Sequence, residues 1–495
     1  MEELENETEA EAGAGAETKE QKKMIAKKFG CKIKNVQFIS EGGEGNIYSF
    51  VDKNNRNRII KIYSNKISNT RGFRNVREET EKQEELIKNT RKTIKALAHG
   101  NFTYKNKEIF YQIYNYMDFD LENAIYNNYL NPYESFMVAL RTVIGICSLH
   151  KNGIAHRDIK LENIMVNLKD KKTKIIDFGF SEKIEENTKY AIGGTFEYIS
   201  PELIKSLIEK QFKVYNNFIF PSDIYALGIT LFTILTKDAT LINSSDYLKI
   251  KLLERDSNMK NLYINIIQNE KLEYLEYLKT NTESKFLPYE TQEIRERFLN
   301  LIKQMIDSDY TKRPTIEEVL KEIMNIYLNI KNIHENKGFL KRYKGNIELK
   351  SREKILIKNY IGIDELIIKE KDVKNIENKA FKKVKSILND KNTTNNLKRH
   401  VGIIVNSIYN NTFKNIKKEN LAELSGGEKL KLRKIENLLV DTKLAYCQYC
   451  LDKEKRNRIE INNEFLMKKT NFLNNLIKAT NYMEEINYME EIKVF

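Results

Sequence analysis

The chain has 495 residues, a formal net charge of +14, and 41 % hydrophobic and 31 % charged residues. This length exceeds what one hydrophobic core fills, so two or three folded units are expected, and the composition is ordinary for a soluble globular protein. No run reaches the roughly 18 apolar residues of a membrane span, so no transmembrane segment is predicted. The longest apolar stretch, residues 224–235, contains Gly228 and threonines and predicts a buried core helix. Because the first residues are acidic, we expect no secretory signal.

The cysteine content indicates the cellular compartment, and the net charge limits the classes of binding partner. The four cysteines are too few and too scattered for a disulfide framework, so we expect a reducing compartment, the cytoplasm, with the nucleus left open. Cys447 and Cys450 have the spacing of a metal or redox pair, but no second such pair exists, and two ordinary cysteines on a helix are the preferred interpretation. The positive charge follows a Lys, Asn and Ile bias along the whole chain, so no clear nucleic-acid or anionic-membrane binding is predicted.

In chain order, the sequence predicts a tail, two folded regions and an extension. Residues 1–28 are expected to be an acidic, disordered tail, because the first 20 residues carry eight Glu and one Lys. Short β-rich runs in residues 33–116 surround one helical, charge-dense stretch at 74–97, which predicts a small sheet with one helix. Helical patterns dominate residues 122–328 and continue, rich in Lys, through an extension of unknown role at residues 335–495.

Two segments, HRDIKLEN at 156–163 and IIDFGF at 175–180, carry the strongest chemical signal. Asp177 follows Asp158 by 19 residues, enough for a strand–turn–strand that brings both carboxylates to one phosphate. Here the sequence resembles the eukaryotic-type Ser/Thr protein kinases, whose catalytic loop reads HRDxKxxN and whose metal loop reads DFG. Phosphoryl transfer needs positioning and charge neutralisation more than covalent chemistry, and such loops provide both.

The resemblance implies a fold, cofactors and roles for four residues. Asp158 would accept or orient the substrate hydroxyl, Lys160 would lie near the γ-phosphate, and Asn163 and Asp177 would hold magnesium. ATP and Mg²⁺ are the implied cofactors, and proteins are the implied substrates. The implied fold is α+β and bilobal, with a kinase domain at residues 30–330. Its β-rich N-lobe would end near residue 117, its helical C-lobe would begin near 118, and the C-terminal helical extension would follow.

Ser/Thr specificity follows from two further matches to the family. Lys160 stands two residues after Asp158, which is the habit of the Ser/Thr branch. GTFEYISPE at 194–202 resembles the end of the activation segment in Ser/Thr kinases, and Thr195 is expected to hydrogen-bond towards Asp158. Ser200 stands where the family usually has Ala, which is a mild departure.

A glycine-containing turn precedes a lysine at the end of an apolar strand. In ISEGGEGNIY, Ser40, Gly42, Gly45 and Ile47 occupy the positions of the phosphate-covering hairpin, although Ser40 replaces the first glycine of the pattern. Glycines there let backbone N–H groups approach phosphate oxygens. Lys61 in RIIK is then expected to contact the α- and β-phosphates.

The glutamate partner of Lys61 and the nucleotide hinge are less sharply defined. Five acids on the following helix compete for the lysine: Glu78, Glu79, Glu81, Glu84 and Glu85. With residues placed 100° apart, Glu79 alone among them lies in the apolar stripe, so we choose Glu79 over Glu84. The hinge is expected at residues 114–117, where Tyr116 and Met117 would contact the nucleotide; an aromatic strand is the alternative.

Three downstream features complete the resemblance. Asp223 in SDIYALG is expected to brace the backbone of the catalytic loop, and Arg313 in KRPT is expected to pair with Glu202. The interval between Glu202 and Arg313 is longer than the family usually has, which predicts insertions near residues 205–220 and 240–290.

Arg157 is a cation that we expect to need an anion. The segment between Asp177 and Pro201 is therefore predicted to be phosphorylated at Thr188 or Tyr190, with the phosphate paired to Arg157.

Three other functions compete with that of an active protein kinase. A pseudokinase, acting as a nucleotide-binding scaffold, usually lacks the metal Asp, the base or the Lys, and none is missing here. An antibiotic-type small-molecule kinase lacks the GTxxYxxPE segment. LSGGEK at 424–429 looks like a transporter ATPase signature, but no GxxxxGK[ST] loop accompanies it, so we interpret it as a turn. The C-terminal helices are left as candidates for partner binding or dimerisation.

Overall fold

The computed structural model divides into two units, residues 1–347 and 348–495, which we describe separately. It describes residues 18–42, 45–63, 73–104, 107–242, 257–281, 286–288, 290–336, 349–363, 366, 368–388 and a few single positions between 394 and 445.

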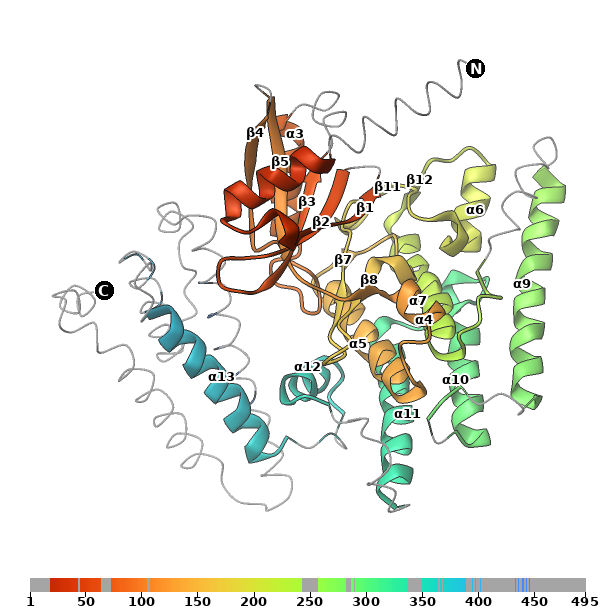
Figure 1. Ribbon diagram of the computed structural model, residues 1–495. Helices are drawn as coiled ribbons and strands as arrows, with labels where there is room; N and C mark the ends of the chain where they lie inside the picture. Colours follow the sequence, from red (N-terminus) through yellow and green to blue (C-terminus); the bar gives the residue numbers. More distant parts are fainter. Residues whose placement is uncertain are drawn as a thin grey trace, which may run out of the picture. The chain divides into compact units, whose positions relative to one another are not determined.

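The first unit begins with an antiparallel sheet in the order β1-β2-β3-β5-β4. Its strands are β1 (Val36–Gly42), β2 (Gly45–Val51), β3 (Asn57–Tyr63), β4 (Ala98–Tyr104) and β5 (Lys107–Asn115), preceded by the 3₁₀ turn η1 (Ile33–Asn35). Side chains alternate across a strand, so the fully buried Ile60 and Ile62 share one face of β3 while Lys61 points to the other. The helix α3 (Phe73–Leu86) follows β3 in the chain (Figure 1).

A helix at residues 18–29 packs on this sheet, drawn in red in Figure 1. Ile25 is fully buried in the same apolar cluster as Tyr48 and Phe50, and the Phe29 ring stacks on Phe50 at 5.0 Å between centroids. The prediction of a disordered tail is therefore wrong for residues 18–28, because apolar side chains late in the segment find a sheet to cover. Residues 1–17 lie outside the described part of the chain.

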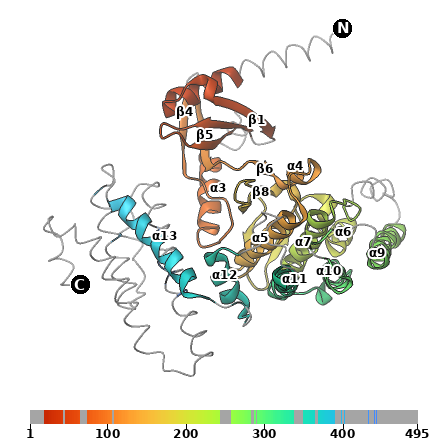
Figure 2. The same cartoon turned by 60° about the horizontal axis from the view of Figure 1, so that its bottom comes forward.

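The larger, helical part of the unit is built around α5 (Pro132–His150) and α7 (Ile219–Thr236). Asn131 caps α5 by accepting from the Glu134 N–H, and Pro132 occupies the first turn, where its missing N–H costs nothing. Figure 2 shows α5 and α7 beside α10 (Gln292–Met305) and α11 (Ile316–Asn336). A Cβ on Gly228 of α7 would lie 2.9 Å from the Met305 Cβ, so glycine permits the close approach of α7 and α10.

α7 is the core helix that the apolar stretch predicted. Residues 216–236 are long and apolar enough to cross a membrane, but 78 % of that window is buried inside the fold. The prediction of a β-rich small lobe followed by a larger helical lobe is confirmed. Several short elements carry the loops described below. Two precede α5, namely β6 (Phe119–Asp120) and α4 (Leu121–Tyr126). Those that follow α5 are β7 (Ile154–Ala155), η2 (Leu161–Asn163), β8 (Ile164–Val166), β9 (Thr173–Ile175), β10 (Glu182–Lys183), β11 (Lys189–Ala191), η3 (Phe196–Tyr198) and α6 (Pro201–Ile208).

The two stretches where insertions were expected contain ordered elements. The first holds β12 (Lys213–Tyr215) and η4 (Asn216–Phe218), and β12 pairs with β11. The second holds α9 (Ser257–Thr280), which packs against α10 and α6. The short turn η5 (Tyr310–Lys312) precedes Arg313.

The second unit contains two described helices, α12 (Ser351–Ile361) and α13 (Glu370–Leu388). Lys354 of α12 pairs with the buried Asp372 of α13 at 3.1 Å, and Gly362 ends α12 in the left-handed conformation that glycine adopts without strain. Cys447, Cys450 and the LSGGEK segment lie outside the described residues. The role of this extension stays a prediction.

The N-terminal helix gives a stability test. Ile25→Ala should lower the free energy of unfolding by about 2–5 kcal/mol, because it leaves a cavity between the helix and the sheet. Urea unfolding of the full chain measures the change. Lys27→Ala, on the exposed side of the same helix, is the matched control and should change it by less than about 0.5 kcal/mol. Equal, small effects of both substitutions would contradict the packing of this helix.

Candidate active site

The catalytic loop lies between β7 and η2 and buries the carboxylate of Asp158. Oδ1 of Asp158 accepts from the backbone N–H and the hydroxyl of Thr195, each at 2.7 Å. Oδ2 accepts from Asn163 Nδ2 at 2.8 Å and lies 3.5 Å from Lys160 Nζ. Lys160 also donates to the Thr195 hydroxyl at 2.6 Å. The structure thus brings Asp158, Lys160 and Asn163 together as predicted, and the expected bond from Thr195 is confirmed.

Asp223 of α7 holds the backbone on the N-terminal side of Asp158. Its carboxylate, 2 % exposed, accepts from the N–H groups of His156 and Arg157, both at 2.8 Å, which confirms the predicted brace. His150 Nε2 lies 3.0 Å from the same carboxylate. Burial alone would raise the pKa of Asp223, but the interactions with His150 and His156 outweigh it and lower the pKa.

Asp177 follows a hairpin that starts at the catalytic loop. β8 and β9 pair antiparallel, with Ile164 opposite Ile175, and the Ile176 N–H donates to the Asn163 carbonyl at 2.9 Å. This is the strand–turn–strand that the spacing predicted. Asp177 is exposed, has a left-handed φ of 56°, and accepts from the Gly179 N–H. The buried Phe178 ring packs edge-on against His156, so the loop is fixed beside the catalytic loop.

Asn163 and Asp177 offer oxygen atoms that suit a hard cation. Asn163 donates from Nδ2 to both the carbonyl and the carboxylate of Asp158, which fixes its amide and leaves Oδ1 out of these two bonds. Asp177 adds an exposed carboxylate. Mg²⁺ is held by one or two protein oxygens together with phosphate and water oxygens, so these two side chains fit it. Within the described residues, no cluster of three or more His, Cys, Asp or Glu is arranged to hold a metal by itself.

Lys61 lies in the middle of the sheet. It stands opposite Ile47 of β2 and Gln112 of β5, and its Nζ lies 4.8 Å from the centroid of the Tyr63 ring. Glu79 lies on α3, but its side chain is outside the described part of the structure, so its pairing with Lys61 stays a prediction. Glu84, the alternative, is half-buried on the same helix.

The glycine-containing turn joins β1 to β2. Gly42 pairs with Gly45, and Ser40 pairs with Ile47 after a bulge in β1. A Cβ on Gly45 would lie 2.1 Å from the Ile62 carbonyl oxygen, so glycine is needed there for β2 to pack against β3. The structure places the hairpin as predicted, while its contact with nucleotide stays a prediction.

Tyr116 and Met117 lie in the short link between β5 and β6. Met117 is buried and Tyr116 is half-buried. The Asp118 side chain accepts from the Leu168 N–H at 2.7 Å and its own N–H donates to the Val166 carbonyl, which fixes the link to the β8–β9 hairpin. This is the position expected of the hinge, although Tyr114 and Asn115 belong to β5.

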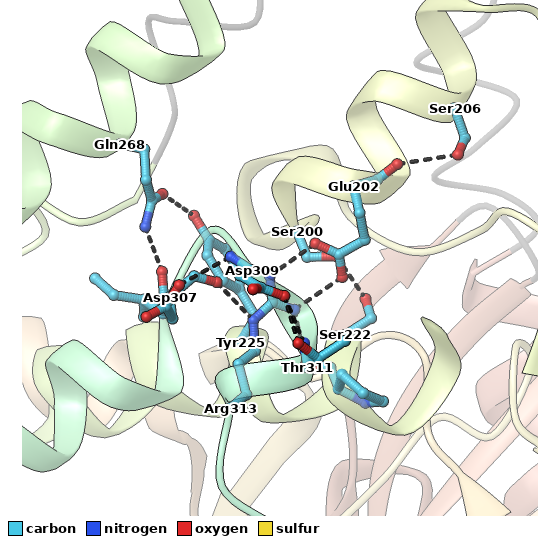
Figure 3. A network of polar contacts seen from close by, with 12 residues as sticks. Ser200, Glu202, Ser206, Ser222, Tyr225, Gln268, Asp307, Asp309, Thr311 and Arg313 are labelled. Atoms are coloured by element: carbon cyan, nitrogen blue, oxygen red, sulfur yellow. Dashed lines mark hydrogen bonds and ion pairs between the residues drawn. The ribbon is translucent and has the colours of Figure 1, made fainter. Parts of the chain in front are cut away.

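A buried ion pair fixes the end of the activation segment (Figure 3). Arg313 makes two hydrogen bonds with Glu202, at 2.8 and 2.7 Å, as predicted, and its side chain is 0 % exposed. Its other donors reach the Asp307 and Pro221 carbonyls, so every part of the guanidinium is engaged. Ser200 donates to Glu202 at 2.6 Å, so the residue that departs from the family pattern adds a bond to this pair.

The network extends to the inserted helix α9. The Tyr225 ring of α7 lies 4.9 Å from the Arg313 guanidinium, and its hydroxyl donates to Gln268 Oε1 of α9 at 3.2 Å (Figure 3). Gln268 in turn donates to the Ile306 carbonyl at the end of α10. The insertion expected near residues 240–290 is thus connected, through Tyr225 and Arg313, to the segment that ends at Glu202.

Glu182 is a functional candidate that the sequence did not reveal, and Gly194, the first residue of the GTFEYISPE match, has a role that the match did not specify. Gly194 has φ 104°, and a Cβ there would lie 2.4 Å from the Arg157 carbonyl oxygen, so only glycine lets the activation segment approach the catalytic loop. Glu182 lies 3.1 Å from Arg157. The premise that Arg157 awaits an anion is therefore wrong, and Tyr190, an expected acceptor, is buried. In the sequence, the adjacent glycines Gly193 and Gly194 before Thr195 were the one signal of this close approach.

Comparison with known proteins agrees with this geometry. Residues 33–323, more than half of the chain, match the family model described as protein kinase domain. The serine/threonine-protein kinases PSK1 and PSK2 of Saccharomyces cerevisiae are 28 % and 30 % identical to 38 % of this chain. A probable serine/threonine-protein kinase of Encephalitozoon cuniculi is 27 % identical to 45 % of it. The matched regions cover 11 %, 13 % and 41 % of those three proteins.

The buried ion pair should matter far more than an exposed one. Arg313→Met should lower the free energy of unfolding by about 3–5 kcal/mol, because it leaves Glu202 buried without its cation. Arg297 pairs with Glu322 at 2.8 Å with both side chains partly exposed, 34 % and 28 %, and is the matched control. Arg297→Met should cost at most about 1 kcal/mol. Chemical denaturation of both variants makes the comparison, and equal losses would contradict the assignment.

Asp223 should give stability a pH dependence. Its pKa is lowered on folding from 3.8, so its stabilisation is fully present above about pH 5 and is lost as the pH falls through the lower folded pKa. Asp223→Asn should therefore be less stable than the native protein at pH 7, by about 2–4 kcal/mol. The difference should shrink on going to pH 3, because the Asp223 carboxylate of the native protein then begins to lose its ionised state. Urea unfolding between pH 7 and 3 measures it; a constant difference would refute the ionised brace.

Proposed function

Because this chain belongs to the protein kinase family, we propose that it is an active enzyme that transfers the γ-phosphate of ATP to serine or threonine hydroxyls of proteins. One observation carries the proposal: the buried Asp158 carboxylate is oriented by Thr195 and Asn163, with Lys160 beside it. Protein kinases as a class act on protein substrates. The proposal adds that this chain is catalytically active, that it uses ATP and Mg²⁺, and that it modifies serine and threonine.

The arrangement supports the proton and charge handling that the reaction requires. The substrate hydroxyl oxygen forms a bond to the γ-phosphorus, the bond from that phosphorus to the bridging oxygen breaks, and ADP leaves. The hydroxyl proton passes to Asp158, whose carboxylate is held at both oxygens and so keeps its direction. Lys160 and Lys61 would neutralise charge on the phosphates. Asn163 and Asp177 would hold Mg²⁺, which when bound screens the charge that develops on the phosphate oxygens.

Ser/Thr specificity is supported by the same contacts. Lys160 bridges Asp158 and Thr195, so the residue typical of the Ser/Thr branch is an integral part of the loop. The relatives named above are called serine/threonine kinases. The Glu202–Arg313 pair fixes the end of the segment on which a peptide would dock, which favours protein over small-molecule substrates.

Removing the base tests catalysis. Asp158→Asn should lower phosphate transfer by about 10²–10⁴-fold, because the amide cannot accept the hydroxyl proton. Radioactive transfer from ATP to Ser, Thr and Tyr peptides, with Mg²⁺ present, measures it. Asp170→Asn, in the turn between β8 and β9, is the control and should keep the native rate.

Three outcomes would contradict all or part of the proposal. Nucleotide binding without transfer by the native chain would indicate a pseudokinase. Equal transfer by the native chain and Asp158→Asn would show that the signal comes from a contaminating kinase. Transfer to Tyr peptides in preference to Ser and Thr would overturn the specificity alone.

A further inference from the structure

Arg157 is a buried cation next to the proposed base. Its side chain is 8 % exposed, and its backbone is held at a left-handed φ of 67°, a conformation that neighbouring contacts must maintain. Nη1 lies 3.1 Å from Glu182 Oε1, and Nη2 donates to the Ala191 carbonyl. Among the residues that the structure describes, Glu182 is the carboxylate paired with this guanidinium. A buried charge is costly without a partner, so Glu182 supplies the compensation.

Backbone pairing fixes where Glu182 stands. β10 pairs antiparallel with β7, with Glu182 opposite Ala155, two residues before Arg157. The Ile184 N–H continues the contact by donating to the Gly153 carbonyl at 2.8 Å. Glu182 is 51 % exposed, so its carboxylate stays hydrated while it approaches Arg157. The pairing of β10 with β7 therefore places the Glu182 carboxylate beside the catalytic loop while that carboxylate stays partly exposed to water.

A second strand pair holds the other side of the segment. β11 pairs with β12, with Tyr190 opposite Val214, and backbone bonds at Asn216 and Ile192 extend the pairing in both directions. Tyr190 is 5 % exposed and belongs to an apolar cluster with Val214, Leu203 and other residues. Its hydroxyl accepts from the Glu185 N–H at 2.7 Å. A phosphate on Tyr190 would have to break this packing.

We propose that Glu182 is a positioning residue that takes the place of an activation-segment phosphate. It balances Arg157 from within the chain, and together with β12 it keeps the segment from Asp177 to Pro201 in its working conformation. The proposal rests on the kinase activity proposed above. It replaces the expectation that Thr188 or Tyr190 must be phosphorylated, because the charge that a phosphate would bring is already in place.

Phosphatase-treated full-length protein tests the proposal. Mass spectrometry first establishes that residues 177–201 carry no phosphate, and kcat and KM are then measured. Treated protein and Thr188→Ala should both keep kcat within about twofold of untreated protein. Glu182→Gln should lower kcat about 10-fold with the KM for ATP unchanged, because the loop is misplaced while the nucleotide site is intact.

Two further variants separate positioning from general damage. Glu182→Asp keeps the negative charge and should recover part of the lost kcat. Glu186→Gln, another exposed glutamate of the same segment, should behave as the native protein. Loss of activity on phosphatase treatment and in Thr188→Ala would overturn the inference while leaving the kinase function standing. A native kcat in Glu182→Gln would overturn it as well.

Hydrogen exchange gives a readout that does not need turnover. In phosphate-free protein, peptides covering residues 180–192 should be protected in the native chain and should exchange faster in Glu182→Gln. Absence of this difference would overturn the role of Glu182. If no form of the protein transfers phosphate, the kinase function fails, and with it the claim of activity without phosphorylation. The exchange difference then reports separately on whether Glu182 orders the segment.

Discussion

The carboxylate of Asp223 determines where the catalytic loop can lie. It is buried in the helical lobe, where an ionised group is tolerated only if its oxygens are satisfied. Two consecutive backbone N–H groups, at His156 and Arg157, together with His150 satisfy it. Because Asp223 belongs to α7, a largely buried helix of the lobe, its two hydrogen bonds attach the loop to the packed core. The orientation of Asp158 is a consequence of this attachment.

A second constraint joins the activation segment to the same loop. Gly194 passes so close to the Arg157 carbonyl that no side chain fits, and Thr195 then reaches both Asp158 and Lys160. Further along, Glu202 is fixed by Arg313, and Tyr225 connects that pair to α9. The segment is therefore attached at the glycine, at the ion pair and, through β12, at its middle. Each attachment uses a different kind of interaction.

The residues that could be predicted from the sequence are those whose chemistry is set by short, local motifs. The catalytic loop, the metal loop, Thr195, Asp223 and the Glu202–Arg313 pair all lie in such motifs, and their mutual contacts were implied by the resemblance of those motifs to the kinase family. The lobes could be assigned for the same reason, since β-rich and helical patterns occupy separate parts of the chain. What could not be predicted depends on distant partners that no sequence motif marks.

Three particular residues illustrate that limit. Ile25 follows an acidic stretch, and composition averaged over that stretch hid a helix that the sheet stabilises. Glu182 is an exposed acid like its neighbours, and only strand pairing brings it to Arg157. Glu79 was chosen among five acids from helical periodicity and from its distance of 18 residues from Lys61, and its side chain lies outside the described residues. Periodicity gives the face of a helix but not the neighbour that the face meets.

The helix at residues 18–29 also changes where the folded domain begins. The family match starts at residue 33, yet Ile25, Ala26 and Phe29 belong to the apolar core of the sheet. A truncation made at residue 33 would expose Tyr48 and Phe50 to solvent, and the resulting apolar patch would favour aggregation. Preparations of the isolated catalytic region should therefore start upstream of residue 18. Aggregation of a shorter version would result from the missing N-terminal helix and would carry no information about phosphate transfer.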